Sequence, residues 1–289
     1  MEIAIISGKG GTGKSSISAA FATLSGQPVV LADCDVDAAN LHILFAPTHE
    51  EDQVYIAGQT AVIDYSICTH CGICMDYCQF DAIHSMDGKI TISETSCDGC
   101  HLCARVCPHG AITMVDNDKS RMYSGAFRNG RMVYGRLAPG EENSGKLVNM
   151  VRDKAKAIAK DYNLENIIID GPPGIGCAVI SSITGTNHVV VVTEPTLSGL
   201  HDLKRALEIV EKFSLKAWVI INKYDLNDDM SRQIEQHCHD RGIPLAGKLP
   251  FNPSVVEAMV NLKSIIEWQP QSEFSRQIGA IWNTITQSK

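Results

Sequence analysis

Short apolar runs recur along the chain, and turn or capping residues bound each of them. Five runs are rich in β-branched residues and are apolar at consecutive positions: residues 2–6, 28–33, 166–170, 188–193 and 217–222. Strands that are covered on both faces show this continuous apolar pattern, because neither face meets water. We therefore predict five buried strands of a parallel sheet.

Helical patterns lie between these runs. Between the fourth and fifth runs, Leu200, Leu203, Leu207 and Val210 recur every three or four residues, which is the spacing of one helix face. Residues 146–162 predict another helix, which leads into the third run. Because strands and helices alternate, the sequence predicts an α/β fold with a doubly wound parallel sheet.

The alternation breaks after Pro47 and resumes near Gly145. Between these points the chain is rich in cysteine and turn residues, and part of it repeats at an offset of 29 residues. The repeated positions are Cys68, Cys71, Cys74, Cys78, Ala82 and Ile83, which recur as Cys97, Cys100, Cys103, Cys107, Ala111 and Ile112. We expect a duplicated small α+β module at 59–116, inserted into a larger domain formed by 1–58 and 117–289.

A glycine-rich motif follows the first predicted strand. Its residues fit the pattern G-x-x-x-x-G-K-[ST]: Gly8, Lys9, Gly10, Gly11, Thr12, Gly13, Lys14 and Ser15. An apolar helix is expected from about Ser16, and a strand before with a helix after is the context in which this motif binds phosphate. Backbone N–H groups and the helix N-terminus would hold the phosphates, Lys14 would contact the outer ones, and Ser15 would ligate Mg²⁺. The sequence therefore predicts a P-loop nucleotide site.

Asp170 ends the third predicted strand and is followed by Gly-Pro-Pro-Gly at 171–174. A carboxylate at the end of a strand can hold the water shell of magnesium. Glycine and proline after it permit a loop that moves with the γ-phosphate. Asp170 is therefore a candidate magnesium residue of a Walker B segment.

Besides Lys14, the motif contains another lysine, Lys9. The resulting sequence, KGGTGKS, resembles the deviant Walker A sequence of the MinD/ParA family. That family includes the nitrogenase iron protein. The resemblance implies ATP as the substrate and a homodimer in which Lys9 reaches the phosphates of the partner subunit. Residues 33–41 resemble the switch I segment of the family, which implies that Asp35 orients or activates the attacking water and that Asp33 lies near Mg²⁺.

The residues that read the base are less sharply defined. Asn222, Lys223 and Asp225 formally match the guanine-reading pattern NKxD, and Asp225 could accept from the N1 and N2 hydrogens of guanine. The family resemblance instead implies that Asn222 contacts adenine. We expect ATP, with GTP as the alternative, and we expect Pro250 and Phe251 to line the base side.

Eight of the eleven cysteines lie between Cys68 and Cys107, in two C-x2-C-x2-C-x3-C runs. This is the spacing of a bacterial two-cluster ferredoxin, in which the fourth cysteine of each run ligates the other cluster. One predicted 4Fe-4S site is Cys68, Cys71, Cys74 and Cys107, and the other is Cys97, Cys100, Cys103 and Cys78. Zinc is the alternative, but four evenly spaced cysteines repeated twice fit tetrahedral zinc poorly. Gln79 stands where a proline usually follows the fourth cysteine.

Cys177 lies seven residues after Asp170, at the offset where the nitrogenase iron protein holds a shared cluster. No second cysteine outside the two runs suits such a cluster, so we interpret Cys177 as a small core residue. At the C-terminal end, a helix carrying Phe274, Ile278, Ile281, Trp282 and Ile285 on one face is predicted. Only Arg276 and Lys289 add positive charge there, which favours docking on the core over stable membrane association.

The net charge of −8 argues against general nucleic-acid binding, which needs a basic face. The first residues lack the pattern of a signal peptide, and no apolar run is long enough to span a membrane, so we expect a cytoplasmic protein. The combined motifs predict an ATP hydrolase that couples its cycle to electron transfer or to metallocofactor assembly with a partner protein. The alternative is an ATP-switched dimeric scaffold whose clusters serve structure or sensing.

Overall fold

The apolar runs lie side by side in one nine-stranded sheet, in a computed structural model that describes residues 1–141 and 144–287. The strand order is β13-β12-β11-β1-β10-β2-β9-β8-β3. The bounds are β1 Glu2–Ser7, β2 Val29–Asp33, β3 Glu51–Tyr55, β8 Ser120–Phe127, β9 Gly130–Arg136, β10 Ile167–Pro173, β11 His188–Thr193, β12 Lys216–Asn222 and β13 Leu245–Leu249. The pairs from β13 to β9 are parallel. The predicted α/β class and parallel sheet are confirmed.

The chain divides into two compact units. The first unit is Met1–Asp52, Met122–Gly135 and Ser144–Lys289, and the second is Gln53–Arg121 and Arg136–Asn143. Residues 122–135 thus return to the first unit, although the alternation seemed broken there. The reason is that β9 pairs in parallel with β2, and its Met132, Val133 and Tyr134 are all buried.

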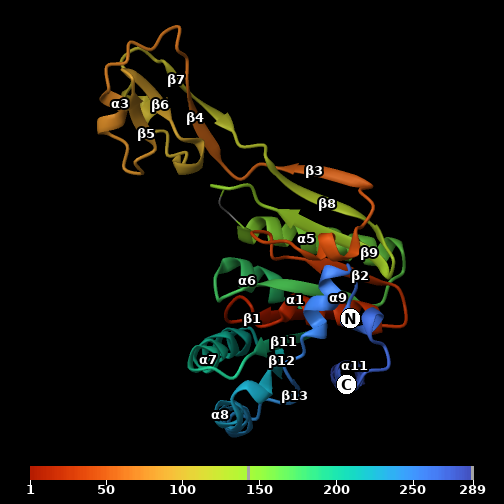
Figure 1. Ribbon diagram of the computed structural model, residues 1–289. Coiled ribbons are helices and arrows are strands. Elements are labelled where there is room, and N and C mark those ends of the chain that lie inside the picture. Colours follow the sequence, from red (N-terminus) through yellow and green to blue (C-terminus); the bar gives the residue numbers. More distant parts are fainter. Residues whose placement is uncertain (142–143, 288–289) are drawn as a thin grey trace. The chain divides into compact units, whose positions relative to one another are not determined.

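Helices cover the sheet of the first unit (Figure 1). Their bounds are α1 Lys14–Leu24, α2 Leu41–Phe45, α5 Ser144–Asp161, α6 Cys177–Ile183, α7 Leu197–Lys212, α8 Asp228–Asp240, α9 Ser254–Val260, α10 Ile265–Trp268 and α11 Glu273–Gln287, with a 3₁₀ turn at Tyr224–Leu226. Helix α1 packs on α10 and α11, while α5, α6 and α7 contact the central strands. The phosphate-binding motif lies between the end of β1 and the start of α1, so it is at the carboxyl ends of the parallel strands.

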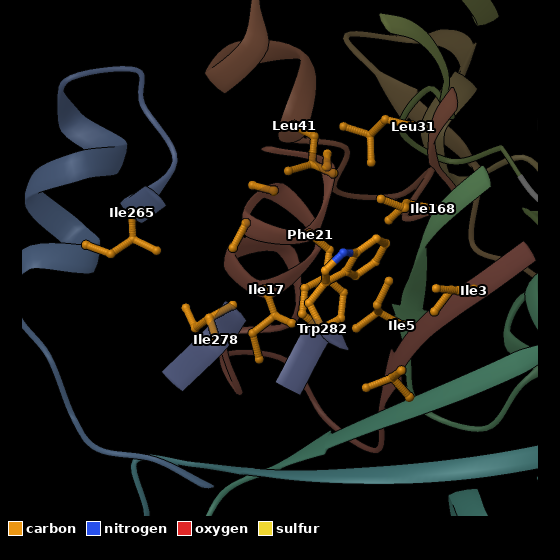
Figure 2. Packing of buried hydrophobic residues seen from close by; sticks show 14 of the residues in the cluster. Ile3, Ile5, Ile17, Phe21, Leu31, Leu41, Ile168, Ile265, Ile278 and Trp282 are labelled. Carbon is orange, nitrogen blue, oxygen red and sulfur yellow. The ribbon is translucent and has the colours of Figure 1, made fainter. Parts of the chain in front are cut away.

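Figure 2 shows the core between the sheet and helices α1 and α11, where Phe21 and Trp282 lie with ring centroids 5.1 Å apart. The predicted C-terminal apolar face is buried in this core through Phe274, Ile278, Ile281, Trp282 and Ile285. Lys289 lies outside the described residues. Among the helices of 1–141 and 144–287, none is long and apolar enough to cross a membrane.

The second unit contains two small antiparallel pairs, β4 with β7 and β5 with β6. Its elements are β4 Gln59–Ile63, α3 Ile73–Asp76, β5 Ile83–Met86, β6 Lys89–Ile92, a 3₁₀ turn at Glu94–Ser96, α4 Leu102–Val106 and β7 Ile112–Asp116. Shifting the first repeat by 29 residues places α3 on α4 and the start of β5 on the start of β7. Each repeat is thus a strand, a short helix and a strand, and the first strand of one repeat pairs with the last strand of the other.

Candidate nucleotide and cluster sites

The P-loop is shaped by its glycines. Gly13 has φ of 90°, which favours glycine, and a Cβ there would lie 2.3 Å from Asn222 Nδ2. This close approach lets Asn222 donate a hydrogen bond of 2.7 Å to the carbonyl of Thr12. The loop is therefore fastened to the end of β12, and α1 begins directly after it at Lys14.

Asp170 is the centre of a buried polar cluster at the loop. Its Oδ1 accepts from Lys14 Nζ and from Ser18 Oγ, each at 2.8 Å, and its Oδ2 accepts from Ser15 Oγ at 2.7 Å. Burial alone would lower the pKa of Lys14, but the charge and hydrogen bond of Asp170 raise it. The side chain of Lys14 is therefore a cation at the P-loop. Ser18 was not predicted from the sequence as a site residue. Its position one helical turn after Lys14 places it on the same face of α1, and this spacing could have indicated its role.

Two further aspartates follow β2 and differ in burial. Asp33 is fully buried and accepts hydrogen bonds from the backbone N–H groups of Asp35, Asn40 and Leu41. Burial, with the neighbouring charge of Asp170, raises its pKa to about 7. Asp35 is more exposed, and its Oδ2 lies 3.6 Å from Lys14 Nζ. Asp33 thus holds the shape of residues 35–41, while Asp35 faces the site.

A cavity of about 680 Å³ opens over the P-loop. Its walls come from the loop, the segment after β2, the segment after β10 and the start of α5; they include Gly10–Ser16, Asp35, Asp37, Asn40, Pro172, Pro173, Ser144, Cys177 and Met259. Thr12 Oγ1 is buried at this loop and has no hydrogen-bond partner within the described part of the chain. Gly8, Lys9, Asp33 and Asp170 do not line the cavity. Cys177 does, and it is exposed rather than a core residue as expected.

Lys9 lies beside the cavity rather than in it. Its Nζ is 2.5 Å from Glu194 Oε1 and donates to Thr196 Oγ1 and Ser198 Oγ. These partners follow β11 or begin α7, and none of them was singled out from the sequence. Gly8 supports this arrangement, because a Cβ on it would lie 2.4 Å from Cβ of Asp202 in α7.

A second, mostly apolar cavity of about 230 Å³ adjoins the P-loop on the side of β12. Asn222, Lys223, Pro250 and Phe251 line it, as expected for a base site, together with Val255, Val256 and Met259. Asp225 does not line it. Its Oδ1 instead accepts from the backbone N–H of Phe251 at 2.6 Å. The structure thus brings together every predicted base residue except Asp225.

The cysteines of the second unit line two narrow hollows. One hollow is lined by Cys68, Cys71, Cys74 and Cys107, and the other by Cys78, Cys97, Cys100 and Cys103. The remaining lining is mostly apolar, and includes Ile63 and Ile112 in the first and Ile83 and Met114 in the second. Each group of four thus takes its fourth cysteine from the other repeat.

Hydrogen bonds near the cysteines involve Cys107 and His70. The backbone N–H of Ala111 donates to Cys107 Sγ at 3.3 Å, the kind of contact that tunes a cluster. His70 Nδ1 accepts from the backbone N–H of Ile90 at 3.1 Å and also lies 3.8 Å from Cys68 Sγ. Across the described ranges, no three or more His, Cys, Asp or Glu side chains are grouped to hold a metal ion.

Comparison with known proteins identifies the larger unit. Residues 3–265 match the CobQ/CobB/MinD/ParA nucleotide binding domain family. An uncharacterized protein of Methanocaldococcus jannaschii is 37% identical over 230 residues, which are 79% of this chain and 80% of that one. The septum site-determining protein MinD of Pyrococcus horikoshii, solved as a complex with Mg-ADP, superposes with a TM-score of 0.59 at 18% identity, covering 98% of this chain and 95% of that chain.

A further relative matches only a short part of the chain. An uncharacterized ferredoxin of Methanocaldococcus jannaschii is 44% identical over 52 residues, which are 17% of this chain and 31% of that protein. This likeness concerns a short segment, whereas the family match runs through nearly the whole chain. The chain belongs to the CobQ/CobB/MinD/ParA nucleotide-binding family and is a P-loop ATPase.

Proposed function

We propose that this ATPase carries two 4Fe-4S clusters and couples ATP binding and hydrolysis to electron transfer or to metallocofactor assembly. The observation that carries the proposal is the sorting of eight cysteines into two hollows of four, in one chain with a P-loop site. The proposal has a nucleotide half and a cluster half, and each is supported by the geometry of its own site. The likeness to a ferredoxin over 52 residues supports the cluster half.

The nucleotide half fits ATP with Mg²⁺. Lys14 would contact the outer phosphates, and Ser15 and Asp170 would bind Mg²⁺ directly or through its water, since Mg²⁺ takes few protein ligands. Asp170 bonds both Lys14 and Ser15, so these three groups lie together at the P-loop. The Mg-ADP in the Pyrococcus horikoshii MinD structure supports the same ligand class.

The chemical step would depend on Asp35. It faces the cavity beside Lys14 and is free of the backbone bonds that hold Asp33. Burial raises the pKa of Asp35, and a carboxylate of raised pKa is a better acceptor for a proton from water. Asp35 would orient the attacking water, while Lys14 neutralises the charge that spreads over the γ-phosphate.

The cluster half fits the hollows by donor type. Cys68, Cys71, Cys74 and Cys107 would hold one cluster, and Cys97, Cys100, Cys103 and Cys78 the other. When bound, the clusters would supply one-electron transfer. Zinc is the alternative, but four evenly spaced cysteines repeated twice fit tetrahedral zinc poorly.

The order of the chain supports coupling between the halves. The second unit enters the chain after residues 33–41, some of which line the nucleotide cavity, and leaves it before Asp170. Strands β3 and β8 each cross the boundary between the units at Asp52 and Met122. A nucleotide-driven shift in residues 33–41 would therefore reach strands that continue into the cluster unit. A redox or assembly protein would be the partner of that unit.

The test is to purify the chain anaerobically, reconstitute it with iron and sulfide, and measure ATP hydrolysis with clusters oxidised, reduced and removed. The proposal expects about eight irons per chain, since each of two clusters holds four. It also expects hydrolysis to change with cluster state. Full cluster content with a rate that is the same in all three states would favour the ATP-switched scaffold instead. The absence of an iron-sulfur signal would remove the redox half altogether.

A further inference from the structure

Glu194, the residue after β11, holds two lysines at once. Its Oε1 lies 2.5 Å from Lys9 Nζ, and its Oε2 lies 3.2 Å from Lys223 Nζ. Lys223 also donates to the carbonyl of Gly11 at 3.0 Å. Burial alone would raise the pKa of Glu194, but the hydrogen bonds from both lysines lower it. An ionised carboxylate therefore ties the P-loop to the end of β12.

Lys9 is fully occupied within its own chain. An ammonium group has three N–H donors, and Glu194, Thr196 and Ser198 supply three acceptors. The side chain of Lys9 is only 29% exposed, and Lys9 does not line the nucleotide cavity. The donors of Lys9 are thus used within its own chain, beside the nucleotide cavity rather than in it.

We propose that Glu194 is a positioning residue, a latch, that holds Lys9 within its own chain and releases it when the chain dimerises around ATP. This inference rests on the proposed ATPase function and on the homodimer that the family resemblance implies, in which Lys9 reaches the phosphates of a second copy. Release does not strip the carboxylate of its partner, because Lys223 stays on Oε2. Lys223 would therefore keep the carboxylate paired after Lys9 has left it.

The latch predicts in which direction a substitution of Glu194 changes dimer formation. A triphosphate offers several negative charges, so it competes for Lys9 better than one carboxylate shared with Lys223. Removing the charge of Glu194 should free Lys9 in advance and ease dimer formation. If Glu194 only shaped the loop, its removal would instead leave dimer formation unchanged or weaken it.

The experiment is sedimentation velocity of the full chain across a titration of a nonhydrolysable ATP analogue. Glu194→Gln keeps the size of the side chain and removes its charge. It should dimerise at about two- to fivefold lower analogue concentration than wild type, the range expected of a partly exposed ion pair. The difference should shrink at high salt, since screening weakens partly exposed pairs.

Three controls separate the latch from a general effect. Glu194→Asp, which keeps the charge, should stay near wild type. Glu235→Gln breaks the pair of Glu235 with Lys248, which is 2.8 Å long and lies outside the site, and should change nothing. In a Lys9→Ala background, Glu194→Gln should bring no gain.

The failures are distinguishable. If wild type dimerises but Glu194→Gln needs equal or more analogue, or gains as much without Lys9 as with it, the latch is overturned and the dimer stands. If wild type and Glu194→Gln both stay monomeric at saturating analogue, the dimer and the latch fall together. If only Glu194→Gln dimerises, the latch is supported in its strongest form.

Discussion

Asp225 Oδ1 accepts a hydrogen bond from the backbone N–H of Phe251 across 2.6 Å. The bond joins the 3₁₀ turn after β12 to the loop after β13, and Phe251 lines the apolar cavity beside the P-loop. Asp225 itself does not line that cavity. The carboxylate that would read guanine in an NKxD site is therefore used to hold a loop.

A substitution of Asp225 tests this assignment. If Asp225 read guanine, Asp225→Asn would shift the preference toward xanthine nucleotides, because xanthine has an oxygen where guanine has its N2 amino group. We expect no gain for XTP and an ATP affinity close to that of wild type, because the amide Oδ1 of asparagine can still accept from the backbone N–H of Phe251. Competition among ATP, GTP and XTP measures it. Tighter XTP binding by the variant, or GTP preferred by wild type, would restore the guanine reading.

Asp35 gives a second prediction. Asp35→Ala should lower the rate of ATP hydrolysis by about 10²- to 10⁴-fold, as expected when a residue that positions or accepts from water is lost. Nucleotide binding should persist, because Lys14, Ser15 and Asp170 are untouched, so the ATP-bound dimer should accumulate. Single-turnover hydrolysis and size-exclusion chromatography with ATP measure the two effects.

The matched control for Asp35 is Asp37→Ala. Asp37 lines the same cavity but does not contact Lys14 in the described residues, so its loss should leave most of the hydrolysis rate. Equal loss of rate in both variants would show that the charge of the segment matters rather than a specific role of Asp35.

The crossed cysteines give a third prediction. Cys78→Ser should disturb the cluster held by Cys97, Cys100 and Cys103, and Cys107→Ser should disturb the cluster of the other repeat. Electron paramagnetic resonance of the reduced variants should show that each change alters a different cluster signal. Cys238→Ser is the control, because Cys238 is buried in α8 of the first unit and should alter neither signal. Loss of the same signal in both variants would contradict the crossed ligand sets.

Much of this architecture could be predicted from the sequence because its signals are local. The strand at 188–193 has the predicted bounds, since a continuous apolar run between turns leaves little alternative. The cysteine sets could be predicted because the repeat fixes which residue is fourth in each run. The place of strand β9 in the sheet could not be predicted, because nothing local in residues 130–136 indicates their parallel pairing with β2.

The site residues that sequence reasoning missed depend on contacts across long stretches of chain. Glu194 lies 185 residues from Lys9 in sequence, and no motif marks it. Asp225 carries a motif, yet its partner is a backbone N–H 26 residues away, so the pattern alone misleads. Cys177 was expected in the core and is exposed, because α6 begins at Cys177 itself, at the rim of the nucleotide cavity.

The central claim is that nucleotide and cluster states influence each other within one chain. The most direct measurement is the reduction potential of the reconstituted clusters with a nonhydrolysable ATP analogue and with ADP. A coupling free energy of about 1–3 kcal/mol, typical of linked sites, corresponds to a shift of roughly 40–130 mV for a one-electron step. The account predicts such a shift in wild type and its loss in Lys14→Ala, which cannot hold the outer phosphates. Potentials that are the same with both nucleotides in the wild type would contradict it.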